Sequence, residues 1–144
     1  MTKALKLAAW NANGLCHHAQ EVRQFIKLLD LDILLVSETH FTERSHMSIP
    51  NYHIYRTDHP DKTAHGGTAV LIRQTLQNHV CAEYRQEHLQ ATTVAVEDNL
   101  GEVTITAAYC PPKHNTKLAK YENFFKTLGH GFIAGSDFNA KNTV

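Results

Sequence analysis

Apolar residues recur along the first part of the chain with two different periods, and each period predicts one kind of element. The run ALKLAAW, followed by Asn and Gly residues, predicts a buried strand that leaves into a tight turn. A second buried strand is predicted over Ile33–Ser37, directly before Glu38. Between the two, an apolar stripe at helical spacing predicts a helix, and it consists of Val22, Phe25, Ile26 and Leu29. Strand, helix and strand within about 35 residues predict a βαβ unit.

The middle of the chain is predicted to be rich in strands. Candidate strands are NYHIYRT (51–57), GGTAVLIR (66–73), ATTVAVED (91–98) and EVTITAAY (102–109). The last two flank a hairpin turn in which Gly101 suits a positive φ.

A second helix is predicted after the Pro111–Pro112 breaker, and a last strand over Phe132–Gly135. The apolar face of this helix consists of Leu118, Tyr121, Phe125 and Leu128. Its predicted caps are Asn115 or Thr116 at the start and Gly129 at the end. Two helices with at least six strands predict an α/β fold in which helices pack on sheets.

The composition is that of one globular domain in a reducing compartment. Of the 144 residues, 42% are hydrophobic and 19% are charged, and the length allows a core of its own. Fourteen basic and fourteen acidic residues give no net charge, so contact with a polyanion would depend on local patches. Three distant cysteines without a CxxC pair favour an intracellular location over a disulfide framework or zinc site. No apolar run approaches the roughly 18 residues of a membrane span, so no membrane partner is expected.

Oxygen-bearing side chains follow the ends of four predicted strands. They are Asn11, Asn13, Glu38, Tyr109, Asp137 and Asn139. Because the crevice of an α/β layer lies beyond one set of strand ends, we expect these side chains to converge. Carboxylate, amide and phenol oxygens suit Mg²⁺, with a substrate phosphate completing its shell. Taken singly, each has an ordinary interpretation, such as a turn residue for Asn13 or a core aromatic for Tyr109.

The eleven histidines form no HxxxH or HxH pair. Metal sites need clustered ligands, so we expect most of these histidines to be solvated surface groups.

Five ordered motifs resemble the endonuclease/exonuclease/phosphatase superfamily. They are WNANGL, LLVSETH, GGTAVLIR, AAYCPPKHN and FIAGSDFNAK. The sequences of these motifs are similar to those of the apurinic-type endonuclease domain at the N-terminus of jockey-like non-LTR retrotransposon polyproteins. In such polyproteins a reverse transcriptase domain lies in the same chain. The resemblance implies a four-layer α/β sandwich, with residues 1–144 as the N-terminal portion of the domain and the second sheet incomplete.

The resemblance also implies a metal site. Glu38 matches the Mg²⁺-binding glutamate, and Mn²⁺ is the expected substitute ion. Asn13 matches a neighbouring position that contributes to the metal shell directly or through water. Asn11 matches the strand-end amide that supports the acidic cluster.

Three further positions match residues that act on the phosphate. Tyr109 matches the phenol placed to contact the scissile phosphate. Asp137 matches the aspartate that orients or deprotonates the attacking water, and Asn139 the amide that hydrogen-bonds the phosphate as charge develops. The implied product is a nicked DNA strand with a 3′-hydroxyl that can prime reverse transcription, so the protein would be nuclear when it acts.

In the family that the motifs resemble, later strands and a late Asp-His pair complete the site. No residue up to Val144 matches that histidine, so impaired or absent activity is expected of this chain. Two alternatives stay open: a catalytically dead fragment of a degenerate element, and a phosphomonoesterase of the same superfamily.

Overall fold

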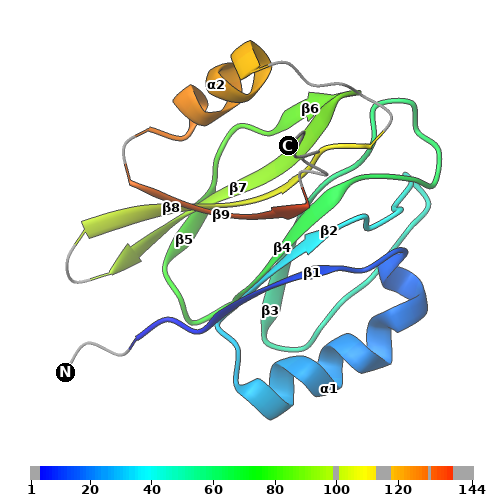
Figure 1. The fold of residues 1–144 in the computed structure, drawn as a ribbon. Coiled ribbons are helices and arrows are strands. Elements are labelled where there is room, and N and C mark those ends of the chain that lie inside the picture. The colour runs from blue at the N-terminus through cyan, green and yellow to red at the C-terminus, as the bar shows by residue number, and fades with distance from the viewer. Residues whose placement is uncertain (1–3, 99–100, 113–117, 130, 138–144) are drawn as a thin grey trace, which may run out of the picture.

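Two β-sheets packed face to face, each with one helix on its outer side, make up the protein (Figure 1). The computed structural model describes residues 4–98, 101–112, 118–129 and 131–137. Helix α1 (Ala19–Leu29) covers the first sheet and helix α2 (Leu118–Thr127) covers the second. The order helix, sheet, sheet, helix confirms the predicted four-layer α/β sandwich. No helix within these ranges is both long and apolar enough to cross a bilayer.

Among the described residues, the first sheet contains four strands in the order β1-β2-β4-β3. They are β1 (Leu7–Asn11), β2 (Ile33–Ser37), β3 (Tyr52–Thr57) and β4 (Thr68–Arg73). β1 and β2 pair in parallel on either side of α1 in the sequence, so the predicted βαβ unit is confirmed. β4 pairs antiparallel with both β2 and β3, which makes this sheet mixed. A short 3-10 helix (Leu15–His18) leads into α1.

The second sheet contains five described strands. They are β5 (Asn78–Val80), β6 (Tyr84–Gln86), β7 (Leu89–Asp98), β8 (Gly101–Tyr109) and β9 (Phe132–Asp137). β7 and β8 form the predicted hairpin, and Gly101 has the expected positive φ, 131°. β9 pairs in parallel with β8, and the register places the backbone of Asp137 beside that of Tyr109. The strands β5 and β6 are additions to the prediction, because three residues are too few to display a period of two.

Side-chain alternation along the strands explains the layers. On β2, Leu34 and Val36 lie in a core cluster with α1, whereas Ile33 and Leu35 lie in a cluster between the two sheets. All five residues of β2 are buried, because both faces of this strand are covered. The unbroken apolar run ILLV is the sequence signature of that double burial.

The buried face of α1 is narrower than the predicted stripe. Val22 and Ile26 are buried as predicted, but Phe25 and Leu29 are 41% and 44% exposed. The predicted buried stripe is therefore wrong for two of its four residues. A helix that covers one sheet buries only the side chains that point at that sheet.

The buried face of α2 is centred on Phe124, which the predicted stripe omits. Phe124 is fully buried and packs with Leu128 against the second sheet, whereas Tyr121 and Phe125 are only partly buried. Of the predicted face, Leu128 is therefore buried as expected, Tyr121 and Phe125 are partly buried, and the side chain of Leu118 lies outside the described residues. The predicted N-caps Asn115 and Thr116 lie outside the described residues. Gly129 has a φ of 79°, as expected for a residue that follows a helix.

Asp32 joins three parts of the first sheet where β2 begins. Its carboxylate accepts hydrogen bonds from the Lys6 backbone nitrogen (2.9 Å) and from Arg73 Nε (3.1 Å), and its side chain is 4% exposed. Asp32→Ala removes both bonds, so we expect the free energy of unfolding to fall by about 2–4 kcal/mol. Asp30 also bonds Arg73, but its side chain is 57% exposed, and Asp30→Asn should cost less than about 1 kcal/mol. Urea denaturation followed by circular dichroism measures both losses, and equal losses would contradict the prediction.

Candidate functional site

Asn11, Glu38 and Tyr109 meet at one end of the sandwich, where β1, β2 and β8 end. The side-chain amide nitrogen of Asn11 donates a hydrogen bond to Glu38 Oε2. The Tyr109 hydroxyl donates to Glu38 Oε1 at 3.2 Å, from the second sheet to the first. Tyr109 is buried, and the Glu38 side chain is 24% exposed, so the carboxylate is held from both sides yet reaches solvent. The structure therefore brings these three predicted site residues together.

Asn13 fixes the direction of the Asn11 amide. Its backbone N–H donates to Asn11 Oδ1 at 3.1 Å, so the nitrogen of that amide points at Glu38. Asn13 itself is exposed and has a positive φ of 44°. Asparagine tolerates this conformation better than most residues, which explains the tight turn after β1.

Glu38 has a backbone conformation that glutamate rarely adopts. Its φ is 54°, and that of His40 is 56°. Such conformations cost about 1–3 kcal/mol each and persist only where the surroundings enforce them. Here the Glu38 carbonyl accepts from the Gly14 amide at 2.9 Å, and the next two amides donate to the carbonyls of Gly67 and Gly66 at 3.3 and 3.0 Å. Two neighbouring loops therefore set the position of the carboxylate.

Gln90 of β7 is a site residue that the sequence analysis does not identify. It is fully buried, its Oε1 accepts from the Gly67 amide at 3.2 Å, and its Nε2 donates to the Gln86 carbonyl at 2.6 Å. It is also the register partner of Tyr109. Gln90 thus ties the glycine pair beside Glu38 to the second sheet. Alternate residues of a strand lie on the same face, so Gln90 shares a face with Val94 and Val96, which lie between the two sheets. A glutamine on this otherwise apolar face is the sequence feature that could have identified it.

The remaining predicted residues lie on β9 or just after it. Asp137 is the last residue of β9, and its backbone lies beside Tyr109 at the same edge as the other strand ends. The side chain of Asp137 and the whole of Asn139 lie outside the described residues, so their predicted roles stay predictions. His40 is an addition to the predicted site, since its Nε2 lies 3.8 Å from Glu38 Oε1.

The donor set around Glu38 fits a hard divalent cation. It consists of a carboxylate, amide groups and a phenol, which are oxygen ligands or donors to them. Each Glu38 oxygen accepts one hydrogen bond from Asn11 or Tyr109, and a carboxylate has about four acceptor positions, so some stay available. A partly exposed carboxylate is a ligand that a hard divalent cation can bind together with water.

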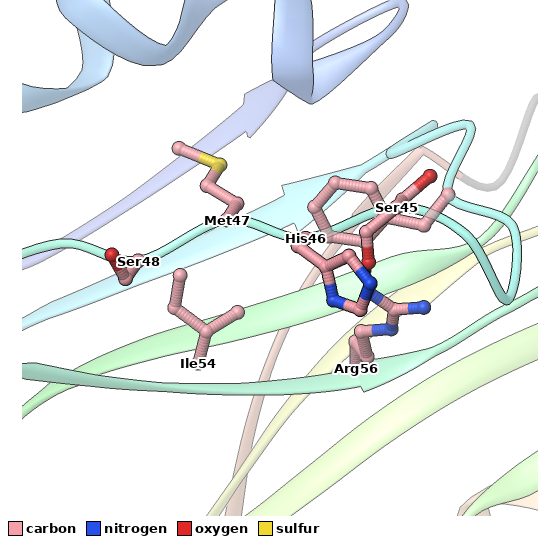
Figure 2. A pocket seen from close by; sticks show the side chains of 7 residues that line it. Ser45, His46, Met47, Ser48, Ile54 and Arg56 are labelled. Carbon is pink, nitrogen blue, oxygen red and sulfur yellow. Dashed lines mark hydrogen bonds between the residues drawn. The ribbon is translucent and has the colours of Figure 1, made fainter.

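A cavity of about 370 Å³ lies between β3 and the segment before it, and its lining does not include Asn11, Glu38 or Tyr109. Figure 2 shows Arg56 of β3 facing the segment Ser45–Ser48. Arg56 has the charge to bind an anion, but its guanidinium donates to the carbonyls of Ser45 (2.7 Å) and Thr42 (2.8 Å) and to Asp58 (2.9 Å). The guanidinium therefore anchors the segment that follows Glu38.

A four-layer sandwich whose strand ends surround one carboxylate and its hydrogen-bonding partners is an architecture of nucleases and phosphatases. The chain belongs to the endonuclease/exonuclease/phosphatase family, which matches residues 8–143.

The curated relatives are polymerases of mobile elements. Over 138 residues, the chain is 34% identical to the RNA-directed DNA polymerase from mobile element jockey of Drosophila melanogaster. It is 30% identical to the jockey polymerase of Drosophila funebris over the same length. These alignments cover 96% of this chain but 15% of each relative, so the chain spans a small part of the proteins that it resembles.

Solved structures confirm the fold. The endonuclease domain of TRAS1, a telomere-specific non-LTR retrotransposon, superposes with a TM-score of 0.69 at 15% identity, covering 95% of this chain and 61% of that one. The AP endonuclease LMAP from Leishmania major gives a TM-score of 0.66 at 14% identity, covering 92% and 54%. TDP2 of D. rerio, complexed with a single-strand DNA product, gives 0.67 at 12% identity, covering 96% and 62%.

Proposed function

We propose that this chain is an endonuclease domain of a jockey-like non-LTR retrotransposon that nicks DNA by Mg²⁺-dependent hydrolysis of phosphodiester bonds. The observation that carries the proposal is the Glu38 carboxylate, fixed by Asn11 and Tyr109 where strands of both sheets end. The jockey polymerases among the relatives favour a mobile-element endonuclease over other activities on this fold.

Glu38 would hold the Mg²⁺, and Asn13 would contribute directly or through water. Mn²⁺ is the expected substitute ion. When bound, the ion neutralises the charge that develops on the phosphate oxygens. Both oxygens of Glu38 already accept hydrogen bonds, so the direction of this carboxylate is set before any ion arrives.

The other residues would act on the phosphate and the attacking water. Tyr109 would contact the scissile phosphate through its hydroxyl, and Asn139 would donate a hydrogen bond to it as negative charge develops. Asp137 would orient or deprotonate the attacking water. Asn11 would act through Glu38, whose carboxylate it holds.

The proposed partners follow from this activity. The substrate would be the target DNA duplex, and a reverse transcriptase domain in the same polyprotein would use the new 3′-hydroxyl. The protein would then act in the nucleus. Because the chain has no net charge, DNA binding would rest on a few local contacts and depend on salt accordingly.

A two-substrate assay separates this proposal from its alternatives. With Mg²⁺ we expect supercoiled plasmid to become open-circular and EDTA to stop the reaction, while a 3′-phosphorylated oligonucleotide releases no phosphate. We expect the nicking to be slow, because these 144 residues include no match to the late Asp-His pair that the resemblance implies. Phosphate release without nicking would favour a phosphomonoesterase. Absence of both activities would favour a non-catalytic fragment.

A further inference from the structure

We propose that His59, Asp61 and His65 form a second metal site, separate from Glu38, that binds a divalent transition ion of the Zn²⁺ type. These three residues, the His-Asp-His cluster, lie in the loop between β3 and β4. The proposal does not depend on the proposed nuclease function, because it rests on the geometry of this loop alone.

The distances within the cluster are close to those of a filled site. His59 Nδ1 lies 3.0 Å from Asp61 Oδ1, and His65 Nε2 lies 3.2 Å from Asp61 Oδ2. One ligand atom of each residue lies within 4.8 Å of the other two. Tetrahedral Zn²⁺ with bonds of about 2.0–2.1 Å holds neighbouring ligand atoms about 3.3 Å apart. The two imidazoles already lie together, with ring centroids 4.0 Å apart, and their ligand nitrogens would have to move from within 4.8 Å to about that separation.

Hydrogen bonds orient the side chains of the cluster toward one another. The Asp61 backbone N–H donates to His59 Nδ1 at 3.2 Å, a bond that an ion at this nitrogen would replace. The Thr63 hydroxyl donates to Asp61 Oδ1 at 2.8 Å, and its oxygen also contacts His65 Nδ1. Histidines that bind a metal through one ring nitrogen usually have a hydrogen-bonding partner at the other, and Thr63 occupies that position for His65.

The cluster is anchored on one side and open on the other. The His59 side chain is 3% exposed, whereas those of Asp61 and His65 are each 40% exposed. The open side would hold water as the fourth ligand. A Cβ built on Gly66 would lie 3.1 Å from His59 and 3.6 Å from Tyr109, so the cluster adjoins the candidate active site.

This cluster contains no histidine pair at HxxxH or HxH spacing, which is why it is not recognisable from histidine spacing alone. The pattern here is His59-x-Asp61-xxx-His65, with the aspartate as the central ligand. A second group also brings three ligand atoms together, and it consists of His79, Glu97 and Glu102. All three of those residues are exposed, and exposed groups of this kind are common without an ion. His79 therefore serves as a control.

The experiment is a metal titration of the purified metal-free chain. Zn²⁺ binding is measured by calorimetry, and Co²⁺ is followed by its visible absorption, which intensifies when the ion is tetrahedral. We expect one Zn²⁺ per chain and an intensified Co²⁺ spectrum. His65→Ala and Asp61→Asn should each weaken Zn²⁺ binding at least about tenfold, while His79→Ala leaves it unchanged. Circular dichroism of each variant confirms that it is folded.

Three outcomes would overturn the proposal. The first is Zn²⁺ binding that is unchanged in both His65→Ala and Asp61→Asn, because the ion would then bind elsewhere. The second is an equal loss in His79→Ala. The third is no binding at all near neutral pH, because protonated imidazoles paired with Asp61 would then explain the geometry without a metal.

Discussion

Replacing Glu38 by Gln is expected to slow Mg²⁺-dependent nicking by at least about 10²–10³-fold. Glutamine has nearly the same shape and still offers an oxygen to Asn11 or Tyr109, so the fold should survive. It has no negative charge, however, and Glu38 is the carboxylate around which the described site is built. Mg²⁺ sites rely on one or two carboxylates, so the loss of one removes much of the affinity.

Glu43→Gln is the matched control for Glu38→Gln. Glu43 lies five residues further along, its side chain is 72% exposed, and it pairs with Lys62 on the surface at 3.5 Å. This variant should nick as the parent chain does. A second readout is Mn²⁺ binding by calorimetry, which needs no turnover and should weaken at least about tenfold in Glu38→Gln alone. Equal nicking and equal Mn²⁺ binding in the two variants would place the metal away from Glu38.

Strand positions could be predicted from the sequence wherever burial leaves a pattern long enough to recognise. The predicted strand Ile33–Ser37 has the bounds observed for β2. A strand that is buried on both faces is an unbroken apolar run in the sequence, and the run stops where the strand leaves the core. The predicted last strand, Phe132–Gly135, continues to Asp137 in the structure. That extension is set by pairing with β8, which the local sequence does not encode.

Part of the site could be predicted because it is made by strand ends. Asn11, Glu38 and Tyr109 each follow or end an apolar strand, and the α/β architecture brings such ends to one edge. The contacts that hold Glu38 could not be predicted in the same way. They depend on a positive φ at Glu38 and on Gln90, which lies 52 positions further along the chain and acts through the backbone of Gly67. No local propensity predicts a glutamate in that conformation.

Leu35 and Gly135 are expected to be coupled, because the Leu35 side chain lies directly against the backbone of Gly135. Leu35 lies on β2 and is 3% exposed, and a Cβ built on Gly135 of β9 would lie 2.6 Å from its Cδ1. Leu35→Ala should destabilise the protein by about 2–5 kcal/mol through the cavity that it leaves. Gly135→Ala should cost about 1–3 kcal/mol through overpacking.

The double variant separates packing from other causes. Leu35→Ala removes the atom that the new methyl group would strike, so the combined loss should be smaller than the sum of the single losses by about 0.5–3 kcal/mol. Relief is incomplete, because the same Cβ would also lie 3.1 Å from Ala9 Cβ. Gly131→Ala is the control, since a Cβ there meets no atom within 4 Å, and it should change stability by less than about 1 kcal/mol. Urea denaturation of the four variants measures the coupling, and strict additivity would show that the two residues do not share space.

The same contact should also affect activity. Leu35 and Gly135 each lie two residues before the end of a strand, β2 leading to Glu38 and β9 ending at Asp137. A methyl group between them would push these strand ends apart, and a displacement of about 1 Å between reacting groups can cost about 10²-fold in rate. Gly135→Ala should therefore reduce nicking in protein that is still folded, and adding Leu35→Ala should restore part of it. Full activity in folded Gly135→Ala would show that the spacing of β2 and β9 does not control the site.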